Sequence, residues 1–133
     1  MQLSKFFYLD EFKCRDGTAV PQQYVPALTE FCETLDSVRQ FFNAPIIVVS
    51  GYRTKEHNTK VGGAKASYHM YDVYGGDGMF AVDIKVTHYV PKVVFDAFEG
   101  LIRCGVLEQG GLGLYPAWVH YDNRGFKKRW VNK

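Results

Sequence analysis

The sequence predicts a small α+β domain, with a mainly antiparallel sheet of about four strands and two main helices. Two segments show the apolar spacing of a helical face, and several short β-type segments follow without strict helix–strand alternation. The chain has 133 residues, which is enough for one hydrophobic core and too few for two. We therefore expect a single domain over residues 1–133.

The first helix is predicted from Val25 to Phe42. Pro26 stands near its start, where proline is tolerated. Apolar residues recur along it at helical spacing: Leu28, Phe31, Cys32, Leu35, Val38 and Phe42. Asn43-Ala44-Pro45 should end the helix, and the β-branched run 46–49 then predicts a buried strand that ends at the turn Ser50-Gly51.

Residues 54–68 are polar and carry Gly62-Gly63, so we expect a loop with at most a short helix. Residues 72–78 hold three glycines and two aspartates, which is typical of a loop. Residues 80–86 predict a strand in which Asp83 points away from the aliphatic face.

The second helix is predicted over residues 90–102, with Pro91 near its start and Gly105 just past its end. The rest of the chain reads as β structure, in three segments at 111–115, 118–122 and 128–131. These segments complete the α+β pattern.

Composition excludes several classes of protein. A hydrophobic content of 47% and an aromatic content of 16% are typical of a globular protein, and no apolar run approaches the length of a membrane span. The net charge is +2, and no stripe of aromatic and basic residues indicates a nucleic-acid module. The C-terminal basic residues, from Arg124 to Lys133, could bind an anionic polymer, but a solvated tail is the simpler interpretation.

The three cysteines, Cys14, Cys32 and Cys104, make an odd count without CxxC spacing. We therefore expect free thiols and no zinc ligand among them. The N-terminus lacks the apolar core of a signal peptide, so we expect the chain to be made in the cytoplasm without an export signal.

His120 and Asp83 stand in predicted strands and are candidates for a metal site. His120 and Asp122 share a face of their strand, and a nearby carboxylate commonly orients a metal-bound imidazole. Asp83 stands in an apolar strand, where a buried carboxylate must be paired or metal-bound; the competing interpretation is the surface of an edge strand. Arg53 follows a strand end, where an arginine can bind a carboxylate or steady an oxyanion, although most such arginines are surface residues.

Several ordered motifs resemble the zinc D-Ala-D-Ala carboxypeptidase family, which includes phage endolysin L-alanyl-D-glutamate peptidases and shares its fold with the hedgehog signalling domain. The resemblance covers most of the chain. Its motifs are Glu11-Phe12-Lys13-Cys14, Ser50-Gly51-Tyr52-Arg53-Thr54-Lys55-Glu56-His57-Asn58, Val61-Gly62-Gly63-Ala64-Lys65-Ala66-Ser67-Tyr68-His69, Ala81-Val82-Asp83-Ile84, Gly111-Leu112-Gly113-Leu114-Tyr115 and Val119-His120-Tyr121-Asp122-Asn123-Arg124-Gly125.

The resemblance implies that His69, Asp83 and His120 bind Zn²⁺. Three protein ligands leave open the fourth position, where catalytic zinc sites keep a water. It also implies that Arg53 binds the substrate and acts in catalysis, and that Ser67 is the small polar residue of the substrate site. The expected activity is zinc-dependent cleavage of peptidoglycan stem peptides at the cell wall, as a carboxypeptidase or an endopeptidase. We expect a monomer, of phage or prophage origin, without nucleic-acid partners or membrane insertion.

Two departures from the family leave alternatives open. The gap between His69 and Asp83 is longer than usual, because residues 72–78 look like an insertion; Asp72 or Asp77 could therefore replace Asp83 as a ligand. Ala117 stands where many relatives place a glutamate base. Asp122 is then the candidate for the catalytic base, with Glu108 as a weaker one. The missing glutamate also motivates an alternative function, a non-catalytic module that binds cell wall or protein. A structural domain of a virion or cell-wall assembly is a third and weaker alternative.

Overall fold

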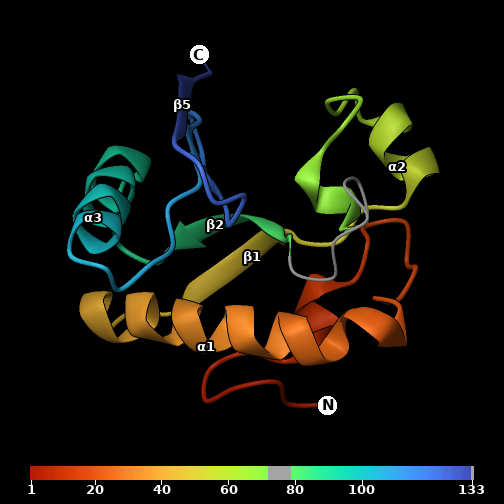
Figure 1. Cartoon of the computed structure of the whole chain (residues 1–133), viewed down its shortest axis with the longest axis horizontal. Helices are drawn as coiled ribbons and strands as arrows, with labels where there is room; N and C mark the ends of the chain where they lie inside the picture. Colours follow the sequence, from red (N-terminus) through yellow and green to blue (C-terminus); the bar gives the residue numbers. More distant parts are fainter. Residues whose placement is uncertain (72–78, 133) are drawn as a thin grey trace.

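The computed structural model describes residues 1–71 and 79–132. The proposed insertion at 72–78, with Asp72 and Asp77, lies outside the described residues, so the choice between these aspartates and Asp83 rests on Asp83 itself. Within the described residues the chain folds as an α+β domain, as the sequence predicts (Figure 1).

Two long helices have almost the predicted bounds. Helix α1 spans Val25–Phe42 and ends at Asn43, whose left-handed φ of 49° is one that asparagine tolerates. Helix α3 spans Pro91–Arg103. The polar segment between the first two strands contains the short helix α2, Lys55–Lys60, which begins where the Thr54 hydroxyl accepts a hydrogen bond from the backbone N–H of His57.

Five strands form one sheet in the order β1-β2-β4-β3-β5. Their bounds are β1 Ile46–Ser50, β2 Ala81–Val86, β3 Gly111–Leu114, β4 Val119–Asp122 and β5 Lys128–Val131. Neighbouring pairs are antiparallel except β3 and β5, which are parallel. Both edges of β4 are taken, by β2 and β3, so the returning strand β5 pairs with β3 and runs in its direction.

The apolar face of the sheet packs on α1 and α3, which lie on the same side of it. Tyr121 of β4 stacks on Phe31 of α1 with ring centroids 5.9 Å apart, and it also contacts Phe98 of α3. Figure 1 shows α1 crossing beneath the strands, with α2 and the C-terminal strand at the opposite side of the molecule. The other face of the sheet therefore carries the polar residues of β2 and β4.

Within the described residues, no helix is long and apolar enough to cross a membrane. The cysteines are free: Cys14 and Cys32 are buried, and Cys104 is exposed. Two of the C-terminal basic residues have internal partners. Arg124 pairs with Asp122, and Arg129 pairs with Glu99, so this segment is less available to an anionic polymer than its sequence suggests.

Candidate metal centre

The sheet places Asp83 directly opposite His120. Strand β2 pairs with β4 in the register Asp83↔His120, so both side chains project from the face away from α1. Asp83 Oδ1 lies 3.0 Å from His120 Nδ1, and the two residues are only 5% and 7% exposed. Strand β2 lies between β1 and β4, so the edge-strand interpretation of Asp83 is wrong.

His69 reaches the same point from a loop. It lies in a 3₁₀ turn, Tyr68–Met70, whose first residue is preceded by Ser67; the Ser67 hydroxyl accepts a hydrogen bond from the His69 backbone N–H at 3.2 Å. The His69 carbonyl accepts from the backbone N–H of Arg53 at 2.8 Å. Its Nε2 then lies 3.3 Å from Asp83 Oδ2. One donor atom of each residue of the triplet lies within 4.8 Å of the others.

The tautomer of His69 follows from its second nitrogen. Nδ1 lies 2.7 Å from the carbonyl oxygen of Gly51, and a carbonyl can only accept, so Nδ1 carries the proton. Burial lowers the pKa of His69 despite its contact with Asp83, which favours the neutral ring. Neutral His69 therefore directs the lone pair of Nε2 at a carboxylate oxygen. A cation between these two atoms would satisfy both, so the donor set fits a metal ion.

His120 is oriented by a second carboxylate. Its Nε2 lies 2.7 Å from Asp122 Oδ2, which leaves Nδ1 facing Asp83. Burial alone would lower the pKa of His120, but its hydrogen bonds to Asp122 and Asp83 outweigh burial and raise it. Burial would likewise raise the pKa of Asp83, and the two histidines outweigh it, so Asp83 stays ionised far below neutral pH.

Asp122 is completely buried and its oxygens are surrounded by donors. Arg124 Nε and Nη2 donate to its two oxygens at 2.8 and 2.7 Å, and the backbone N–H groups of Gly111 and Arg124 also donate to it. Hydrogen bonds from Arg124 and His120 outweigh burial and lower the pKa of Asp122. A Cβ on Gly111 would fall too close to this carboxylate, so the glycine of β3 makes the arrangement possible.

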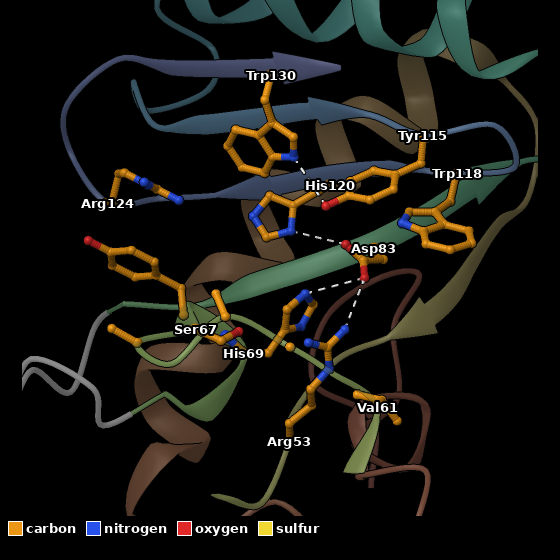
Figure 2. A pocket seen from close by; sticks show the side chains of 14 residues that line it. Arg53, Val61, Ser67, His69, Asp83, Tyr115, Trp118, His120, Arg124 and Trp130 are labelled. Carbon is orange, nitrogen blue, oxygen red and sulfur yellow. Dashed lines mark hydrogen bonds and ion pairs between the residues drawn. The ribbon is translucent and has the colours of Figure 1, made fainter. Parts of the chain in front are cut away.

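Arg53 lies at the loop edge of the cluster. Its Nη2 is 3.5 Å from Asp83 Oδ2, and its Nη1 donates to the Asn58 side-chain oxygen at 3.2 Å. Asn58 is itself buried and donates to the carbonyl of Ala64. Figure 2 shows Arg53, His69 and His120 converging on Asp83. The structure thus brings together Arg53 and the three predicted metal ligands.

Arg53 and the three predicted metal ligands line a pocket of about 510 Å³. Aromatic side chains form its far side: Tyr115 stacks on Trp118 at 5.0 Å, and Trp130 Nε1 donates to the Tyr115 hydroxyl (Figure 2). Ser67 lines the pocket too, at its loop side. Glu108 is exposed and Ala117 lines a different cavity, so neither faces this pocket.

Tyr115 and Asn58 stand within the motifs of the resemblance, but the sequence does not predict a role for either, nor for Trp118 and Trp130. The role of Asn58 follows from its bond to Arg53, since a polar residue in a polar segment carries no pattern of its own. Tyr115 and Trp118 stand at the ends of a β-turn between predicted strands, and only the hairpin of β3 and β4 brings them together. His88 is exposed in a turn and His57 lies in α2, both apart from the pocket.

Comparison with known proteins identifies the family. A family model described as Peptidase M15 matches residues 5–122, a stretch that holds all three predicted ligands together with Arg53 and Asp122. Neither the curated proteins nor the solved structures that were searched gave a match. A match over most of the chain, together with a buried cluster that fits a metal ion, shows that the chain belongs to the peptidase M15 family.

Proposed function

We propose that this protein is a zinc peptidase that cleaves peptidoglycan stem peptides at the bacterial cell wall. The orientation of the two histidines carries the proposal. Each histidine gives one ring nitrogen to an acceptor outside the cluster, Gly51 or Asp122, and turns the other towards Asp83. Imidazole nitrogens and a carboxylate oxygen held in this way are a usual zinc donor set.

His69, Asp83 and His120 would hold the metal. Bound zinc would supply a Lewis acid that activates water and polarises the scissile carbonyl. The pocket is open beside the cluster, so a peptide can approach while the ligands stay buried. Arg53, whose guanidinium lies against Asp83 with 17% of its side chain exposed, would bind the substrate carboxylate or its developing oxyanion.

Asp122 has two possible roles, and its contacts favour one of them. A base that moves a proton needs access to the substrate, whereas Asp122 is fully buried behind His120 and receives both guanidinium donors of Arg124. We propose that it holds the His120 ring in place. Its role as the catalytic base stays a prediction, which Asp122→Asn tests.

The substrate class is supported by the shape and chemistry of the pocket. Arg53 provides a positive charge for the free carboxylates of short stem peptides, and the face of Trp130 and Tyr115 provides apolar surface for small side chains. Such short peptides fit a pocket of about 510 Å³.

The decisive experiment combines zinc quantification with digestion of purified peptidoglycan and mass analysis of the fragments. We expect His120→Ala to lose bound zinc and cleavage together. His88→Asn is the matched control, because His88 is exposed at a positive φ of 73° that asparagine tolerates. Full cleavage by His120→Ala would refute the proposal.

The same experiment separates the alternatives. A wild-type chain that binds zinc and peptidoglycan but releases no fragments would favour a non-catalytic binding module, and a chain that binds no zinc would favour a structural domain. The fragment masses would also name the bond, and so decide between carboxypeptidase and endopeptidase action.

A further inference from the structure

A second group of side chains that could hold a metal ion lies outside the pocket. Cys14 and Asp16 come from the turn that follows the N-terminal 3₁₀ helix Leu9–Phe12, and His57 comes from α2. One donor atom of each residue lies within 4.8 Å of the other two. The sequence predicts no zinc ligand among the cysteines, because Cys14 lacks a CxxC partner and His57 stands about forty residues further along the chain.

Hydrogen bonds fix the turn that carries the thiol and the carboxylate. The Cys14 N–H donates to the Thr18 carbonyl at 2.8 Å, and the Gly17 N–H donates to the Cys14 carbonyl at 2.9 Å. The Thr18 N–H donates to Asp16 Oδ1 at 2.9 Å. Cys14 is completely buried, whereas Asp16 is exposed. The sulfur is therefore enclosed by the fold, and the carboxylate beside it lies at the surface, where it can exchange a hydrogen bond for a metal ion.

Thr54 connects this turn to α2. Its hydroxyl donates to Asp16 Oδ2 at 3.0 Å and accepts from the His57 backbone N–H at 3.1 Å. The same hydroxyl lies 4.0 Å from Cys14 Sγ. Thr54 thus contacts all three candidate residues, through the side chains of Cys14 and Asp16 and the backbone of His57. None of the three lines the pocket of the first cluster.

The chemistry of the three side chains favours zinc. A thiolate, an imidazole and a carboxylate are all zinc ligands, and the soft sulfur disfavours calcium and magnesium. Zinc bonds of roughly 2.0–2.3 Å put neighbouring donor atoms roughly 3–4 Å apart in a tetrahedron. The observed limit of 4.8 Å needs only a small rotation of the exposed Asp16 and the half-exposed His57.

We propose that Cys14, Asp16 and His57 form a second zinc site, which joins the N-terminal turn to α2. Its consequence for the pocket is mechanical: α2 carries Asn58, and the Asn58 side chain holds Arg53. Zinc at this second site would therefore steady the arginine without contacting the first cluster. The proposal does not depend on the peptidase function, since it concerns metal binding alone.

Cobalt substitution tests the second site selectively. A cobalt ion bound by a thiolate gives a charge-transfer band in the near ultraviolet, and the first cluster contains no cysteine. We expect the cobalt-loaded full-length chain to show this band and to bind about two metal ions per chain. Cys14→Ser should remove the band, and His57→Ala, which changes a half-exposed side chain on a short helix, should weaken or remove it.

The controls separate this site from the first. His120→Ala should lose about one metal ion and keep the band. Cys104→Ser should keep both metal ions and the band, because Cys104 is exposed at the end of α3. A wild-type chain without the band, or a band that survives Cys14→Ser, would overturn the second site. Loss of the metal from the first cluster alone would count against the proposed peptidase instead.

Discussion

The two sides of the first cluster are held in different ways. On the strand side, Asp83, His120 and Asp122 stand in register on β2 and β4, where backbone pairing on both edges fixes their positions. On the loop side, Arg53, Ser67 and His69 come from the segment between β1 and β2, and local hydrogen bonds hold them. The strand side therefore fixes the metal donors, and the loop side brings the remaining donor and the substrate-binding charge to them.

This difference predicts that substitutions on the loop side reduce turnover and that substitutions on the strand side reduce metal binding. The exception is His69, which is a loop residue and a ligand. Its contact with the Gly51 carbonyl ties it to the end of β1, so it shares the rigidity of the strand side. Four variants, from the largest expected effect to the smallest, examine the comparison.

The largest effect is expected for Arg53→Ala. Removing one donor from a developing oxyanion costs roughly 10²–10³-fold in kcat. Zinc content should not fall, because the change removes a positive charge beside the metal ligands. Steady-state cleavage of a purified stem peptide and zinc quantification on the same preparation measure both. Arg103→Ala is the control, because Arg103 is an exposed arginine at the end of α3, away from both groups of candidate ligands. A loss of zinc with Arg53→Ala would mean that the loop side supports the metal directly.

Asp122→Asn is expected to act on the metal. Changing a carboxylate that orients a ligating histidine typically lowers metal affinity roughly 10–100-fold. If Asp122 only holds His120, saturating zinc should restore most of the turnover. If Asp122 carries the proton, kcat should stay low at every zinc concentration. Asp96→Asn, an exposed aspartate of α3 paired with Lys92, is the matched control. Titration of activity against free zinc distinguishes the two roles.

The same comparison explains which parts of the site the sequence could predict. His120 and Asp122 are two residues apart on one strand and so share a face, and Asp83 interrupts an apolar strand. The period of two in a strand is therefore enough to put each on the polar face. The helices α1 and α3 follow from apolar spacing and from proline near their starts. These regular elements have their own periodic signal, and the structure confirms their bounds to within a residue or two.

The loop side has no such signal. Nothing in the polar segment that contains α2 indicates that Asn58 is buried or that it bonds Arg53, since these contacts join residues whose local patterns are unremarkable. The sequence also does not predict the parallel pairing of β5 with β3, because the residues of a short strand do not indicate which strand it pairs with. His69 is predicted as a ligand only by the family resemblance, and its tautomer follows only from the contact of Nδ1 with the Gly51 carbonyl in the structure.

Gly63→Ala sharpens the contrast with a smaller effect. A Cβ at this position would collide with the Asn58 side-chain amide and lie 2.9 Å from Arg53 Nη1. The amide must move, so we expect kcat/KM to fall by roughly 10-fold, about 1.4 kcal/mol in transition-state free energy, through misplacement of Arg53. Zinc content should stay constant. Gly62 is unsuitable as the control because its φ is positive. Lys65→Ala is the control instead, since it changes an exposed side chain of the same loop that does not line the pocket. Unchanged kinetics would show that Asn58 does not position Arg53.

Ser67→Ala tests the weakest of these links, the hydroxyl that accepts the His69 N–H. Removing such a cap costs about 1 kcal/mol, and the buried N–H then lacks its acceptor. The His69 ring keeps its Gly51 contact, so zinc affinity should fall by a factor of about 5 at most, while the free energy of unfolding falls by about 1 kcal/mol. Urea unfolding of the zinc-loaded chain measures the stability, and competition with a chelator measures the affinity. Ser67→Thr keeps the hydroxyl and should restore both. A large loss of turnover in Ser67→Ala at saturating zinc would instead assign this hydroxyl a direct contact with the substrate.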